Sequence, residues 1–146
     1  MNCEGCTLCC KLFNIPWMNS PEGKYCEKCE PDKGCKIYDT IPEKCKSYKC
    51  AYNQAPNLNT DLRPDKCGIV FEKATDKIFY GTLDTNFVMN DVIDKQIKSF
   101  LEKGFSVVLR HLYIPAPVIF NSENTTAENI WKELKETWLH LRMQQI

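Results

Sequence analysis

Hydrophobic and polar residues alternate regularly only in the second half of the chain. Residues 68–84 alternate apolar and polar side chains on both sides of residues 74–77, and this period of two predicts a β-hairpin. Residues 105–114 are rich in β-branched and aromatic side chains, which predicts a further strand. Two prolines then interrupt the pattern, and residues 118–120 are expected to resume the pairing.

Two helices are predicted in the same half from a period of about 3.6 residues. The first has Asn90 as its expected N-cap and ends at Gly104. Its buried face is expected to hold Val92, Ile93, Ile97, Phe100 and Leu101. The second follows a capping box made by Thr125 and Glu128. Its buried face is expected to hold Ile130, Leu134, Trp138 and Leu141. The resulting order, β-β-α-β-β-α, predicts a small α+β fold.

The first half of the chain has no such period. All ten cysteines and six of the eight prolines lie within residues 3–67, and short helices are expected only around residues 5–14 and 44–52. A segment of this kind buries too little apolar surface to offset its chain entropy, so it needs a cross-link or a metal. We therefore expect a cysteine-rich, metal-nucleated region, residues 1–67, packed on an α+β region, residues 68–146, as one compact unit.

Charge and hydropathy exclude several classes of function. The 19 basic and 19 acidic residues give a formal net charge of zero, which argues against a nucleic-acid partner. No apolar run approaches the ~20 residues of a membrane span, and no signal peptide precedes the cysteines. A cytoplasmic location is therefore expected. Because disulfides rarely persist there, the cysteines indicate metal ligation rather than a disulfide knot.

Three cysteine motifs carry the candidate chemistry: CEGCTLCC at residues 3–10, CEKCEPDKGC at 26–35 and CKSYKC at 45–50. A C-x-x-C step lets two thiolates bind one ion, and repeated steps complete an S₄ shell. The predicted ligands are Cys3, Cys6, Cys9, Cys10, Cys26, Cys29, Cys35, Cys45 and Cys50. Cys67 is a candidate for a further ligand or for a spare buried thiol.

The spacing leaves the metal open between zinc and a [4Fe–4S] cluster. His111 and His140 are far from the thiols in sequence, so the site is all-thiolate, which suits zinc, iron–sulfur clusters or Cu(I). Residues 3–9 match the start of a ferredoxin run but lack its continuation. Since Cys9 and Cys10 are adjacent, they point in different directions and favour two ions. Zinc is preferred.

In this order, the cysteine motifs resemble the CxxCxxCC family of zinc- or iron-chelating proteins, also called YkgJ-type cysteine-cluster proteins. The resemblance covers roughly residues 3–72. It includes the element C-x-IY-x-x-RP-x-x-C, matched here by Cys35, Ile37, Tyr38, Pro42 and Cys45. Ile41 and Lys46 stand where the family has arginines, so any anion-pairing role of those arginines is weakened here. The motifs are also similar to the cysteine-rich part of flagellin lysine methylases.

The sequence therefore predicts an all-cysteine metal-binding protein with an accessory or interaction role. An iron–sulfur protein with redox or protein-modifying activity and a metal carrier are the alternatives. No phosphate-binding loop, nucleophile elbow or H-E-x-x-H motif supports a dedicated enzyme. Tyr38 and Tyr48, which lie between the cysteines, are expected to shield the metal and to donate hydrogen bonds to its ligands.

Overall fold

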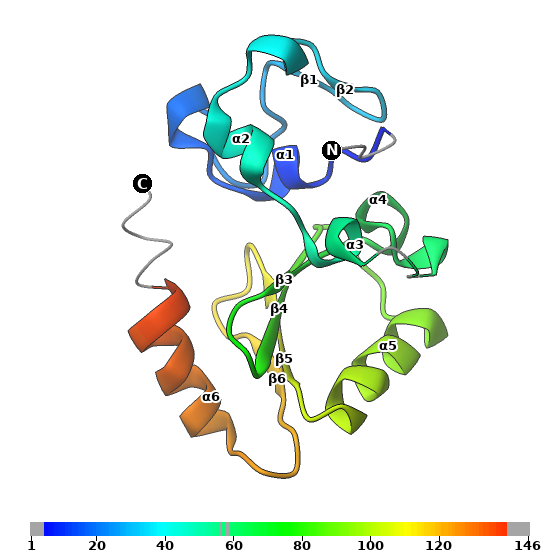
Figure 1. Ribbon diagram of the computed structural model, residues 1–146, viewed down its shortest axis with the longest axis vertical. Coiled ribbons are helices and arrows are strands. Elements are labelled where there is room, and N and C mark those ends of the chain that lie inside the picture. The colour runs from blue at the N-terminus through cyan, green and yellow to red at the C-terminus, as the bar shows by residue number, and fades with distance from the viewer. Residues whose placement is uncertain (1–4, 56, 58, 140–146) are drawn as a thin grey trace.

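The computed structural model in Figure 1 describes residues 5–55, 57 and 59–139. Its centre is a four-stranded sheet with the order β3-β4-β5-β6. The strands are β3 (Ile69–Lys73), β4 (Ile78–Leu83), β5 (Ser106–His111) and β6 (Val118–Phe120). The β3–β4 and β5–β6 pairs are antiparallel and the β4–β5 pair is parallel. The predicted hairpin, the central strand and the resumed pairing at residues 118–120 are all confirmed.

Helices α5 (Asp91–Glu102) and α6 (Ala127–Glu133) lie on opposite faces of this sheet (Figure 1). The predicted N-cap of α5 is confirmed, because Asn90 Oδ1 accepts hydrogen bonds from the backbone N–H groups of Val92 and Ile93 at 3.0 and 3.1 Å. Gly104 follows the C-cap with a positive φ of 85°, as expected for the residue that ends the helix.

The predicted cap of α6 is wrong by one residue. The N-cap is Thr126, whose Oγ1 accepts the N–H of Asn129 at 3.3 Å. Thr125 stays in the preceding turn, since its own N–H donates to the carbonyl of Ser122. The helix continues as a π-helical segment, η4 (Leu134–Leu139). Ile130 and Leu134 are buried as expected, whereas Leu141 and the side chain of Trp138 lie outside the described part of the chain.

Two hydrophobic clusters fill the space between the sheet and its helices. The cluster under α5 includes Ile69, Phe71, Leu83, Ile93, Ile97, Val107 and Leu109. The cluster under α6 is made by Ile78, Tyr80, Val108, Ile130 and Leu134. Alternate residues of β5 thus face opposite helices, as the pleat of a strand requires. The small α+β fold is confirmed.

The cysteine-rich region is built from short elements at one end of the sheet (Figure 1). Its helices are α1 (Cys9–Leu12), α2 (Glu43–Ser47), α3 (Ala51–Gln54) and α4 (Pro64–Cys67), with the 3-10 turns η1 (Pro16–Met18), η2 (Tyr38–Thr40) and η3 (Thr60–Leu62). A two-stranded hairpin joins β1 (Cys29–Glu30) and β2 (Gly34–Cys35). The helix expected around residues 44–52 is split, because Tyr48 and Cys50 have extended backbones.

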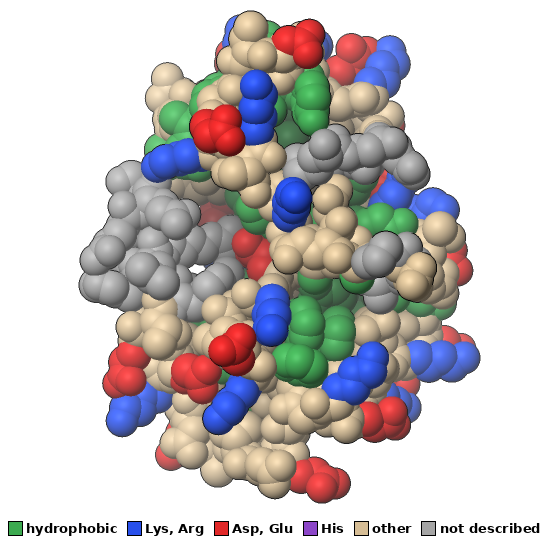
Figure 2. All heavy atoms as spheres, viewed as in Figure 1, with side chains coloured by type: hydrophobic (Ala, Val, Ile, Leu, Met, Phe, Trp, Pro, Cys, Tyr) green, Lys and Arg blue, Asp and Glu red, His purple; other side chains and the backbone are tan. Residues whose placement is uncertain are grey.

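A third hydrophobic cluster connects this region to the sheet. It contains Leu8, Leu12, Phe13, Ile15, Cys26, Cys29 and Val70. Since Val70 belongs to β3, residues on both sides of position 67 share one core. Figure 2 shows acidic and basic side chains dispersed over one face of the molecule, with hydrophobic side chains exposed between them. None of the described helices is long and apolar enough to cross a membrane.

Candidate metal centre

The cysteine motifs, which are separated in sequence, converge on one cavity of about 380 Å³. Eight of the nine described cysteines line it: Cys6, Cys9, Cys10, Cys26, Cys29, Cys35, Cys45 and Cys50. The described cysteines are all free thiols. The remaining lining is largely apolar and includes Ile15, Met18 and Pro64, with Val70 contributed by the sheet. The fold therefore brings together eight of the nine predicted ligands, and Cys3 lies outside the described residues.

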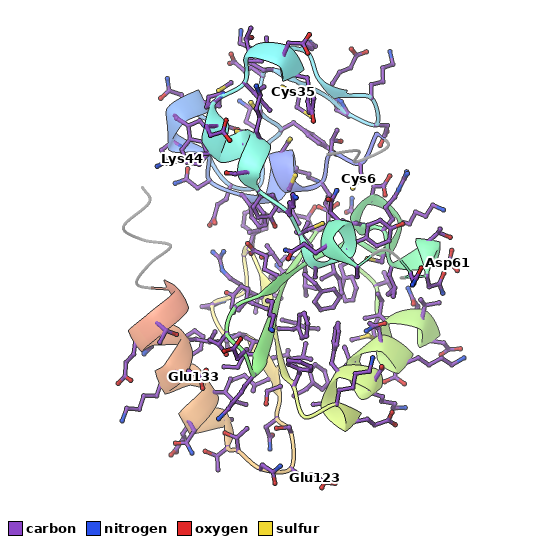
Figure 3. All side chains as sticks on the ribbon, in the orientation of Figure 1. Cys6, Cys35, Lys44, Asp61, Glu123 and Glu133 are labelled. Carbon is purple, nitrogen blue, oxygen red and sulfur yellow. The ribbon has the colours of Figure 1, made fainter. Side chains whose placement is uncertain are left out.

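Backbone pairing positions the thiols of the outer part of the cavity. Cys29 and Cys35 are partners across the β1–β2 hairpin. The N–H of Cys26 donates to the carbonyl of Cys10 at 3.1 Å, and the N–H of Cys29 donates to the carbonyl of Cys26 at 2.9 Å. Cys45 reaches the same space from α2. Figure 3 shows sulfur atoms gathered in this region, with Cys35 farther from the sheet than Cys6.

Gly5 explains how the first motif closes against the hairpin. Its φ is +83°, and a Cβ atom at this position would lie 2.6 Å from the carbonyl oxygen of Asp32. Only glycine fits such a close approach in the left-handed region. Thr7 completes the contact, because its Oγ1 accepts the N–H of Asp32 at 3.2 Å. Residues 5–7 and the β1–β2 turn are thereby held together.

The inner part of the cavity, toward the sheet, contains Cys6 and Cys50. Backbone N–H groups of Leu8 and Asp65 hydrogen-bond the Cys6 sulfur, and those of Tyr52 and Asn53 hydrogen-bond the Cys50 sulfur. Amide donors favour the thiolate form of a cysteine, which is the form that binds a metal. Burial has the larger effect, and it raises the pKa of Cys6 to about 11 and that of Cys50 above its ordinary value.

Neighbouring thiols of the cavity also raise one another's pKa. A hydrogen bond with Cys9, together with burial, raises the pKa of Cys10 far above its ordinary value. Burial and the neighbouring Cys10 raise the pKa of Cys29 to about 12. Burial also raises the pKa of Cys45, to which the charges of Cys10 and Cys26 contribute. Closely spaced thiolates repel one another, so these groups ionise together only beside a cation.

Two side chains that the sequence analysis did not identify contact these sulfurs. Trp17 Nε1 donates a hydrogen bond to Cys45 Sγ at 3.0 Å. The Thr7 side chain, which is 3% exposed, hydrogen-bonds Cys29. Both contacts join residues more than twenty positions apart, so the local spacing of residues does not predict them. The only signal in the sequence is that aromatic and polar residues lie between the cysteines.

The predicted tyrosines both border the cavity. Tyr38 is exposed, and Tyr48 packs edge-on against Phe13 with 5.3 Å between the ring centroids. They are thus placed to shield the cavity, while their hydrogen bonds to a metal ligand stay a prediction. His111 lies on β5, where its Nδ1 accepts the N–H of Tyr113, and His140 lies outside the described residues.

Cys67 differs from the other described thiols. It does not line the cavity but packs in the cluster under α5. Its Sγ hydrogen-bonds the carbonyls of Leu62 and Ile69 at 3.4 and 3.5 Å, and burial raises its pKa to about 11. These contacts match the spare buried thiol that was one of its two expected roles.

Within the described residues, no three histidine, cysteine, aspartate or glutamate side chains form a group that would hold a metal ion as they stand. The thiols share a cavity without having the closed geometry of a metal shell. The chain matches no family model, and it has no significant match among curated proteins or solved structures.

Proposed function

We propose that the protein binds metal ions through its cysteine thiolates and that zinc is the bound metal. The observation that carries this proposal is the convergence of eight free cysteines on one cavity. Placing several thiolates together in one cavity is unfavourable unless a cation balances their charge. Zinc accepts an all-thiolate tetrahedral shell with Zn–S bonds of about 2.3 Å. Metal binding then has to draw the thiols closer than they now stand.

Two ions per chain are proposed because the eight cavity thiols, together with Cys3, exceed the four ligands of one tetrahedral shell. The inner thiols Cys6 and Cys50 are close enough for the charge of Cys50 to raise the pKa of Cys6. Cys9 would be the third ligand of the same ion. Cys3 precedes Cys6 with C-x-x-C spacing and would supply the fourth ligand. The outer set contains five thiols: Cys10, Cys26, Cys29, Cys35 and Cys45. Adjacent Cys9 and Cys10 would then serve different ions.

Closed all-cysteine zinc sites have no open position for substrate. They support an accessory or interaction role in which the metal stabilises the fold, as the resemblance to the CxxCxxCC family also implies. The free thiols accord with a reducing, cytoplasmic environment. An iron–sulfur cluster is the second candidate, because the apolar lining of one continuous cavity and the amide donors to sulfur suit such clusters as well.

Elemental analysis of protein purified without oxygen, together with its visible spectrum, tests the proposal. We expect colourless protein with two zinc ions per chain. Cys50→Ser, which leaves the inner set only three thiols, should lose one equivalent, and the control Cys67→Ser, which lies outside the cavity, should keep both. A brown protein that contains iron and acid-labile sulfide would contradict the zinc proposal and support the iron–sulfur cluster. A protein that contains no metal and takes up none contradicts both.

A further inference from the structure

Trp17 is held at the tip of a tight loop beside the cavity. Ile15 and Ser20 form a small antiparallel bridge, with N–H to carbonyl distances of 2.7 and 3.1 Å in the two directions. The 3-10 turn η1 lies between them. The indole is 38% exposed, yet its N–H points at Cys45 Sγ. The backbone of this loop thus fixes the Trp17 ring. The ring faces solvent, and its only hydrogen-bond donor, the indole N–H, is used on a thiol.

Lys44 holds the same ring from another side. Its Nζ lies 5.1 Å from the centroid of the Trp17 ring, within the range of a cation–π interaction. Figure 3 places Lys44 at the outer edge of the cysteine-rich region. Since Lys44 directly precedes Cys45 on α2, the indole is attached to this helix at two neighbouring residues.

Cys45 is one of the partly exposed outer thiols. Cys26 and Cys29 are buried, whereas Cys45, like Cys10 and Cys35, is partly exposed. An incoming chelator or acceptor protein therefore reaches a metal ion on the side of these exposed thiols before it reaches the buried ligands, and of the three only Cys45 carries the Trp17 hydrogen bond. A metal-bound thiolate carries less charge than a free one, and hydrogen bonds strengthen as the acceptor becomes more charged. An N–H aimed at Cys45 Sγ thus favours the dissociated ligand.

We infer that Trp17 is a positioning residue that makes Cys45 the exchangeable ligand, through which the outer metal ion is transferred to an acceptor. The inference rests on the proposed metal binding. In the exchange, a donor atom of the acceptor binds Zn²⁺ while the Zn–Sγ bond of Cys45 breaks. The electron pair stays on Cys45 Sγ, which is stabilised by the indole N–H, and no oxidation or reduction takes place.

Stopped-flow transfer of zinc from the loaded protein to the chelator 4-(2-pyridylazo)resorcinol tests this inference. Trp17→Phe keeps the ring and removes the donor, so transfer should become about three to ten times slower, the factor that corresponds to one ordinary hydrogen bond. Trp131→Phe is the matched control. Trp131 also carries a lysine over its ring, Lys135 at 5.3 Å, but it lies on α6 and packs against the cluster under that helix, so its loss should leave the rate unchanged.

A second background separates positioning from loosening of the fold. In Cys45→Ser, which leaves four outer thiols, adding Trp17→Phe should have no further effect. Faster or unchanged transfer in Trp17→Phe, or an effect that persists in Cys45→Ser, overturns the inference. Lys44→Met removes the cation from the Trp17 ring but keeps the indole N–H, so it should slow transfer by a smaller factor. It replaces Trp17→Phe as the test if that variant fails to fold. Wild-type protein that takes up no zinc overturns the proposed function, and this inference with it.

Discussion

Lys11 Nζ lies 2.7 Å from Asp84 Oδ1, and this ion pair joins helix α1 to the turn that follows β4. Both side chains are only 18% exposed. Asp84 is itself fixed, because its Oδ1 also accepts the N–H of Thr85 at 2.7 Å and its own N–H donates to the carbonyl of Gly68 at 2.8 Å. The residue after Cys10 is thereby anchored to the end of the sheet.

Lys11→Met should destabilise the protein by about 1–2 kcal/mol, because it leaves a largely buried carboxylate without its cation. Urea unfolding measures the change in the free energy of unfolding. Lys98→Met is the control, since Lys98 pairs with Asp94 in an i,i+4 arrangement on the surface of α5, where such pairs contribute little. If both substitutions have the same effect, the Lys11–Asp84 pair does not anchor the cysteine-rich region.

Removal of metal should unfold the cysteine-rich region but leave the sheet. The thiols come from short elements with few buried apolar residues of their own, so the region depends on its metal. The clusters under α5 and α6 contain none of the cavity cysteines. Chelation should therefore abolish the near-ultraviolet circular dichroism of aromatic residues such as Trp17, while the far-ultraviolet signal of the sheet is largely retained. An unchanged near-ultraviolet spectrum would falsify metal-dependent folding.

The buried Cys67 thiol should make stability depend on pH at alkaline values. Its pKa rises from 9.0 to about 11 because of burial. Below pH 9 the thiol is protonated in both states and its contribution is intact. Between about pH 9 and 11 the unfolded chain releases the proton and the folded chain keeps it, so the free energy of unfolding falls with pH.

Between pH 9 and pH 11 the free energy of unfolding should fall by about 1.4 kcal/mol for each pH unit because of Cys67. Cys67→Ala should abolish this contribution. The measurement is the difference in unfolding free energy between wild type and Cys67→Ala at pH 9 and at pH 11. We expect this difference to shrink as the pH rises. A difference that stays constant across the window would show that Cys67 ionises as readily in the folded protein as in the unfolded chain.

The periodic half of the chain was predictable because its elements are fixed by local patterns. Asn90 caps α5 through its own neighbours, and residues 118–120 pair as their β-branched composition indicates. The cysteine-rich half was not predictable in the same way. Its hairpin depends on positive φ values at Asp32 and Gly34, and the spacing of the cysteines alone does not reveal which thiols face one another.

The contacts of the candidate site also depend on tertiary packing. Trp17 reaches Cys45 across 28 positions and Thr7 reaches Asp32 across 25, so neither partner has a sequence signature. The capping box at Thr125 failed for a related reason. Two consecutive threonines both suit an N-cap, and the turn formed with Ser122 decides between them.

Gly81 lies on β4 between its partners Phe71 on β3 and Leu109 on β5. A Cβ atom on Gly81 would lie 2.7 Å from Leu109 Cδ2 and 3.0 Å from side-chain atoms of Ile69 and Phe71. Gly81→Ala should therefore cost about 1–3 kcal/mol of stability through overpacking, measured by urea unfolding.

The adjacent Thr82→Val is the control, for which the free energy of unfolding should rise instead of fall. Thr82 Oγ1 is buried without a hydrogen-bond partner among the described residues, so replacing the hydroxyl by a methyl group should stabilise by about 1 kcal/mol. Destabilisation by both variants would mean that Thr82 has a partner and that β4 tolerates no change at either position.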